Sequence, residues 1–100
     1  MHADDPARVE AGRGLTRQIA QGHALAVQRF LDELETWEEP WRRTATVSDR
    51  GLRLTPVQLG QLVAEVGELL DRYKADEAGG DGAERVKVIF DAFPQRGEAL

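Results

Sequence analysis

Leu54-Thr55-Pro56-Val57-Gln58-Leu59 marks the start of the best-defined element in this sequence, an amphipathic helix that runs to about Lys74. Thr55 is a favourable N-cap, because its hydroxyl can accept a hydrogen bond from a first-turn amide. Pro56 at the next position has no amide proton to leave unpaired, and Gln58 completes a capping box. Apolar side chains then recur at helical spacing at Leu59, Leu62, Val63, Val66, Leu70 and Tyr73. This face needs a partner, which the rest of the fold has to supply.

A second, longer helical pattern runs from Thr16 to about Trp37, where Pro40 is expected to stop it. Its apolar stripe is wider than the roughly 100° of arc that one neighbouring element covers. The surplus predicts a second contact surface, most simply the same helix of another subunit in a homodimer. The predicted dimer interface comprises Ala20, Ala24, Val27 and Leu31. Residues 1–14 hold charges, glycines and few apolar side chains, which predicts a flexible N-terminal tail.

After Trp41 the pattern changes to a period of two, which favours strands at 42–47 and 51–54, joined by a turn into a hairpin. Residues 86–92 alternate in the same way, after a flexible polar loop at 76–82. The expected fold class is therefore α+β. A long N-terminal helix, the hairpin, the second helix and a third strand would form a three-stranded antiparallel sheet of order 2-1-3, covered by helices. Residues 15–94 are expected to form one domain, followed by a C-terminal tail at 95–100.

Composition limits the function. The chain has 13 basic and 18 acidic residues, so its formal charge of -5 disfavours nucleic-acid binding by this chain alone. It has no cysteine, and its two histidines form no spaced cluster, so we expect no metal site and no cofactor. We find no catalytic motif and expect no enzyme activity. No apolar run is long enough for a membrane span and no signal peptide is evident, which favours a cytoplasmic protein.

Aromatic side chains mark a candidate ligand site. Two tryptophans flank a proline in Trp37-Glu38-Glu39-Pro40-Trp41, and their indoles could line an apolar pocket for a small-molecule effector. The alternative is that they pack in the core or in a dimer interface, as buried tryptophans commonly do. A histidine in the middle of the apolar stripe is likewise either a ligand-binding group or a satisfied interface residue. The candidate ligand-binding residues are Trp37, Trp41, Tyr73, His23, Phe30 and Arg42.

Several of these segments together carry a family resemblance. They are Trp37-Glu38-Glu39-Pro40-Trp41-Arg42, Leu52-Arg53-Leu54-Thr55-Pro56 with Leu59, Leu62 and Leu69-Leu70-Asp71-Arg72-Tyr73, and Arg85-Val86-Lys87-Val88 with Ala92-Phe93-Pro94. In order and spacing they resemble the C-terminal half of ArsR-like winged helix-turn-helix regulators from bacteria. The resemblance implies a dimerisation and effector-sensing domain of a transcriptional regulator, with DNA binding in a winged helix that is missing here. The alternative is a stand-alone small-molecule-binding or protein-interaction domain with no DNA link.

Overall fold

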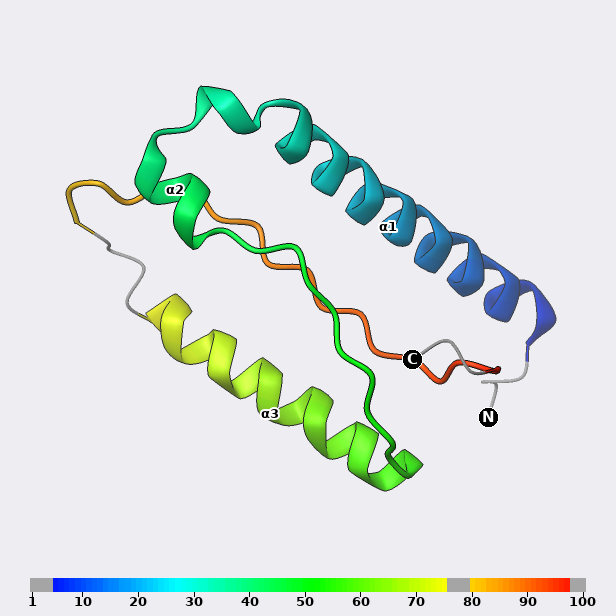
Figure 1. Cartoon of the computed structure of the whole chain (residues 1–100). Helices are drawn as coiled ribbons and strands as arrows, with labels where there is room; N and C mark the ends of the chain where they lie inside the picture. The colour runs from blue at the N-terminus through cyan, green and yellow to red at the C-terminus, as the bar shows by residue number, and fades with distance from the viewer. Residues whose placement is uncertain (1–4, 76–79, 98–100) are drawn as a thin grey trace. The chain divides into compact units, whose positions relative to one another are not determined.

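Four helical elements make up the regular structure of the residues that are described. The computed structural model describes residues 5–75 and 80–97. Its elements are α1 (Pro6–Asp32), the 3-10 helix η1 (Leu34–Thr36), α2 (Glu39–Thr44) and α3 (Pro56–Ala75) (Figure 1). The chain divides into two units, Met1–Ser48 and Asp49–Leu100. The first unit therefore contains α1, η1 and α2, and the second contains α3, and each is described by itself.

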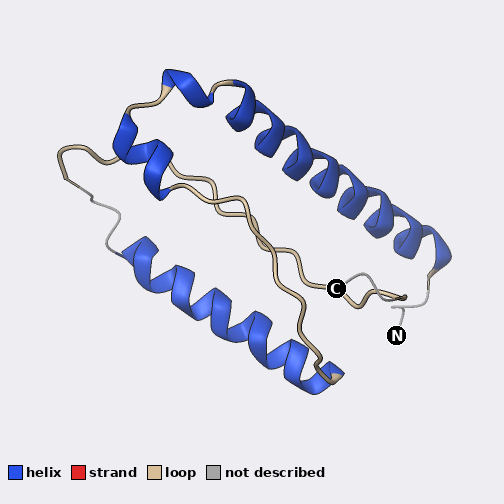
Figure 2. Ribbon diagram, in the orientation of Figure 1, coloured by secondary structure: helices blue, strands red, loops and turns tan. Residues whose placement is uncertain are grey.

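The described residues contain no β-strand, so the predicted α+β class with its three-stranded antiparallel sheet is wrong. Of the three segments with a period of two, residues 45–47, 51–54 and 86–92 are drawn as loops (Figure 2). Within the described part of the chain, residues 46–54 and 85–90 form no backbone–backbone hydrogen bond. A strand exists only where a neighbouring strand pairs with its amides and carbonyls, and a lone hairpin is marginal in water. Alternation therefore indicated residues able to form strands, but the single chain does not pair them.

The first predicted strand, at 42–47, is also wrong in its own backbone conformation, because residues 42–44 belong to the helix α2. Pro40 was expected to end a helix, but it lies in the first turn of a new one. A proline is tolerated there, since first-turn amides have no partner within the helix and its fixed φ already suits helical geometry. The amides of Trp41 and Arg42 both donate to the carbonyl of Glu38, at 3.0 and 3.2 Å, and so close this first turn.

The long helix differs from its predicted limits at both ends. α1 begins at Pro6 rather than near Leu15, and the side chain of Asp5 caps it by accepting a hydrogen bond from the Ala7 amide at 3.0 Å. A proline in the first turn and an aspartate N-cap are strong start signals that an argument based on apolar burial alone does not weigh. The helix ends at Asp32, and η1 occupies most of the remaining predicted stretch. Residues 1–4 and 98–100 lie outside the described residues.

The helix after Thr55 is confirmed, including its start. The Gln58 amide donates to the Thr55 hydroxyl at 3.2 Å, and the Thr55 amide donates to the Gln58 side-chain oxygen at 2.8 Å. These two reciprocal bonds are the predicted capping box. The helix runs from Pro56 to Ala75, one residue beyond Lys74. Part of the polar loop predicted at 76–82 lies outside the described residues. Its end is a turn in which the Ala83 amide donates to the Gly80 carbonyl and Gly82 has a φ of 90°.

We expect replacement of Thr55 by alanine to cost about 1 kcal/mol of unfolding free energy, because it removes the acceptor for the Gln58 amide. Denaturant titration followed by circular dichroism measures this loss. Thr55→Ser is the matched control, since it keeps the hydroxyl and should stay within a few tenths of a kcal/mol of the parent. An alanine variant as stable as the serine variant would show that the capping box does not stabilise α3.

No side chain in the described residues is buried, so neither unit contains a dry core. Half-exposed residues nevertheless collect on defined faces. In the first unit, apart from Val9 near the start of α1, they are His23, Ala26, Val27, Phe30, Leu34, Trp37 and Trp41. In the second unit they are Leu59, Leu62, Val66 and Ile89. Among the described helices, none combines the length and the apolar composition that crossing a bilayer requires. Each unit therefore has an apolar face that its own residues cover only in part.

Candidate functional site

An aromatic pair lies where α1 has ended and α2 begins. Trp37 follows η1 directly, and Trp41 lies in α2, so the short turn between the two elements brings both indoles together. Their ring centroids are 6.3 Å apart and the ring planes are tilted by 59°. This is the range and tilt favoured by aromatic pairs, whose ring edges are attracted to neighbouring ring faces. Both side chains are half-exposed, so their outer surfaces remain accessible to a ligand or to another chain.

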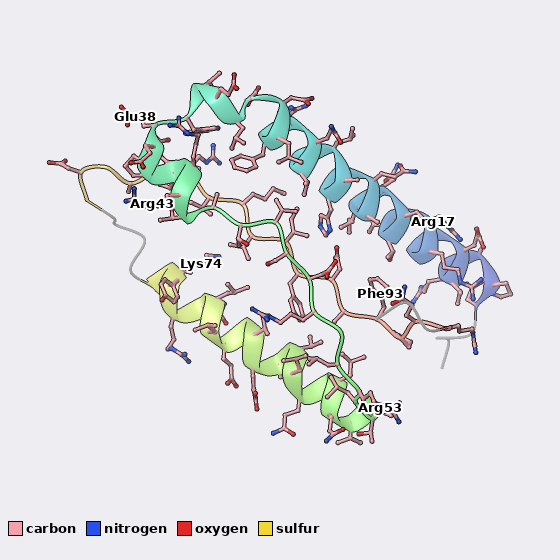
Figure 3. The ribbon with its side chains drawn as sticks, viewed as in Figure 1. Arg17, Glu38, Arg43, Arg53, Lys74 and Phe93 are labelled. Atoms are coloured by element: carbon pink, nitrogen blue, oxygen red, sulfur yellow. The ribbon has the colours of Figure 1, made fainter. Side chains whose placement is uncertain are left out.

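Two arginines follow the aromatic pair, and they differ in their partners. Arg43 forms an exposed ion pair with Glu39 at 2.9 Å, one turn away on α2. Arg42 instead donates a hydrogen bond to the carbonyl oxygen of Trp37. Among the described residues, no carboxylate forms an ion pair with Arg42. The Arg42 guanidinium is thus bound to the backbone of Trp37, and within the described residues no side-chain carboxylate neutralises its charge. Figure 3 labels Glu38 and Arg43 in this region.

The remaining candidate ligand residues come from other elements. Phe30 and His23 lie two turns apart on the same face of α1, and both are half-exposed. Tyr73 is exposed near the C-terminal end of α3 and belongs to the second unit. The first unit therefore contains five of the six candidates, Phe30 and His23 on α1 and the Trp37, Trp41 and Arg42 cluster that we call the tryptophan–arginine cluster. A role in ligand binding stays a prediction for all six residues.

The four residues of the predicted dimer interface lie on α1. Ala20, Ala24 and Leu31 are exposed, with 47% of Leu31 accessible, while Val27 is half-exposed. At about 100° per residue, Leu31 lies roughly 100° around the helix from Phe30. The four interface residues therefore form a flank beside the face that carries Phe30, as the width of the stripe predicted. Nothing in the described first unit buries this flank.

One surface depression was missed from the sequence. It is lined by Leu25, Gln28, Arg29, Asp32 and Glu33. All but Glu33 belong to the last turns of α1, so its walls come almost entirely from one helix, and a ligand there would remain largely in contact with water. Sites that bind small molecules usually enclose most of the ligand between several elements. The depression therefore gives less support for binding than the tryptophan–arginine cluster does.

The described residues contain no group of three His, Cys, Asp or Glu side chains that could hold a metal ion. The features that remain are an uncovered apolar flank on α1 and an aromatic pair beside an arginine. No family model, curated protein or solved structure matches the chain.

Proposed function

We propose that this chain is the homodimerisation and small-molecule-sensing domain of a bacterial, cytoplasmic transcriptional regulator of the ArsR-like type. DNA would be bound by a winged helix outside residues 1–100, and this chain would have no enzyme activity. The observation that carries the proposal is the exposed and half-exposed apolar surface of the first unit, which comprises the flank of α1 and the tryptophan–arginine cluster. One part of that surface suits a second copy, and the other suits an effector.

The support for dimerisation is the exposure of the α1 flank. Contiguous apolar patches are unusual on monomers and common at two-fold interfaces, where the same strip of two subunits meets. Ala20 and Ala24 are small enough to let two helices approach closely, and Val27 and Leu31 would fill the contact between them. A second copy of this helix would thus cover the flank that the chain itself leaves exposed.

The support for effector binding is the chemistry of the tryptophan–arginine cluster. Indole surfaces attract planar apolar groups. The Arg42 guanidinium can donate further hydrogen bonds to a carboxylate, because among the described residues it bonds only to the Trp37 carbonyl. An apolar acid with an aromatic ring would use both features. We therefore take aromatic carboxylates as the class of effector that best fits this cluster.

We expect 1-naphthoate to quench the tryptophan fluorescence of the protein in a saturable way. Arg42→Gln should weaken its apparent affinity about tenfold, since a charge-assisted hydrogen bond contributes roughly 1.5–3 kcal/mol. Arg43→Gln is the matched control, because that guanidinium is already paired with Glu39, and the variant should bind like the parent. The cation 1-naphthylmethylammonium should bind more weakly than naphthoate. Equal losses in both arginine variants would contradict a specific role for Arg42.

We also expect this chain alone not to bind DNA specifically. It is acidic overall, and phosphate contacts need a basic surface. Fluorescence anisotropy at physiological salt should show no sequence-dependent binding to the promoter region of its own gene at submicromolar concentration. A DNA fragment of random sequence serves as the control. Submicromolar binding that depended on sequence would contradict the proposal that DNA is bound by a winged helix outside residues 1–100.

The second candidate function is a stand-alone domain that binds small molecules or proteins and has no link to DNA. The acidic charge favours it, because that charge adds no electrostatic attraction to a nucleic acid. The coding sequence immediately upstream of Met1 separates the two candidates. An in-frame winged helix there supports the regulator. A stop codon and a ribosome-binding site directly before Met1 support the stand-alone domain.

A further inference from the structure

Residues 85–91 present an uncovered row of apolar side chains in the second unit. The alternating positions Val86, Val88 and Phe90 are 66%, 59% and 40% exposed, whereas Ile89 between them is half-exposed. Successive side chains of an extended segment point to opposite sides, so the three exposed residues share one face. The segment is rich in β-branched and aromatic residues, which suit a paired strand. The composition and the exposure of this segment together indicate that it could pair with another strand.

The backbone of residues 85–90 is also unpaired within the described part of the chain. Residues 85–90 form no backbone–backbone hydrogen bond with other described residues. An exposed, apolar strand-like segment with open amides and carbonyls is a template for pairing with another chain. The turn that contains Gly82 precedes this segment, and Pro94, which has no amide proton, follows it. The segment able to pair is therefore short, which favours a closed pair over an extended aggregate.

We propose that residues 85–91 pair antiparallel with the same residues of a second copy, with Val88 on the two-fold axis. The inference rests on the homodimer proposed above and names a second contact in it. In this register, Val86 of each copy lies opposite Phe90 of the other, an aromatic and β-branched pair of the kind that stabilises sheets. Arg85 lies opposite Asp91 of the other copy, so opposite charges face each other across the axis. The segment is thus complementary to itself.

The neighbouring registers fit less well. A two-fold axis at Lys87 would place two lysines directly opposite each other, and facing like charges destabilise a sheet. An axis at Ile89 would place Arg85 opposite the apolar Phe93, and Val86 opposite the small Ala92. Only the register centred on Val88 pairs all three exposed apolar residues of one copy with those of the other. Charge disfavours the Lys87 register but not the Ile89 register, which would pair Lys87 with Asp91. The choice of Val88 over Ile89 therefore follows from side-chain size and from the pairing of the exposed apolar residues.

Cysteine cross-linking tests this register, and the chain has no cysteine of its own. In the proposed pair, the two Val88 α-carbons lie about 4.5–5.5 Å apart, within the distance that a disulfide can bridge. We expect Val88→Cys protein to form a disulfide-linked dimer in nearly full yield under mild oxidation. Val86→Cys is the matched control. Its two copies would be offset by four residues along the strands, roughly 13 Å, which is too far for a disulfide. A mixture of Val86→Cys and Phe90→Cys chains should cross-link to each other.

Light scattering of the parent protein, which has no cysteine, separates this inference from the proposed dimer. If the parent is a dimer but Val88→Cys does not cross-link, the strand pair is wrong and the dimer proposal stands. If Val86→Cys cross-links alone as readily as Val88→Cys, the register is wrong. A monomeric parent overturns both proposals, and a mass far above two chains overturns the closed pair. A dimeric parent with selective cross-linking at Val88 supports the inference.

Discussion

Leu31→Glu is expected to dissociate the proposed homodimer, raising its dissociation constant at least about a hundredfold, equivalent to roughly 2.7 kcal/mol. Leu31 is exposed in the single chain and lies on the α1 flank with Ala20, Ala24 and Val27. A two-fold contact through this flank would bring two glutamates into a dry seam, where an unpaired charge loses its hydration and faces a like charge. Light scattering over a concentration series measures the change from dimer to monomer.

Leu25→Glu is the matched control for this substitution. It changes the same residue type on the same helix, at a position 65% exposed and about 120° around α1 from Leu31. A charge there stays in water if the interface is the flank, so this variant should remain dimeric. A parent protein that is monomeric at tens of micromolar would remove the interface. A Leu31→Glu variant that remains fully dimeric would place the interface on another surface.

The thermal midpoint of the parent protein should rise with protein concentration, by about 3–6 °C for each tenfold increase. The physical reason is that no described side chain is buried within the single chain, so the proposed dimer would supply apolar burial that the single chain lacks. Unfolding is then coupled to dissociation, and a tenfold higher concentration stabilises the dimer by about 1.4 kcal/mol. Melting curves followed by circular dichroism over two orders of magnitude in concentration measure the shift.

Leu31→Glu provides the control for this second prediction. If assembly supplies the missing core, the variant should melt at a lower temperature, and its midpoint should depend less on concentration. A parent midpoint that stays constant across the whole series would show that the chain is stable without a partner. The apolar faces on α1 and α3 would then need another explanation.

Local features of the sequence were sufficient to predict α3. Its start depends on Thr55, Pro56 and Gln58, which lie within four residues of one another, and the structure contains the two hydrogen bonds that they were expected to form. Its apolar face follows from the helical period alone. Asp5 and Pro6 carry an equally local start signal for α1, one that an argument from burial overlooked. Capping is read correctly from a sequence because its partners are neighbours in the chain.

The candidate site was predictable only in part. Trp37 and Trp41 are four residues apart, so their proximity could be expected, and the exposed flank of α1 followed from the width of its apolar stripe. The sequence did not show that Arg42 binds the Trp37 carbonyl whereas Arg43 pairs with Glu39. That difference depends on the turn between η1 and α2, in which Pro40 starts a helix instead of ending one.

The sequence by itself determined which segments are amphipathic, where α3 begins, and that residues 46–54 and 85–93 have the composition of strands. Only the tertiary structure decided whether those segments pair, and in the described part of the single chain they do not. The physical reason is that helical hydrogen bonds close within four residues, whereas strand hydrogen bonds need a second strand from elsewhere in the chain or from another molecule. Helices could therefore be predicted from local sequence, and the sheet could not.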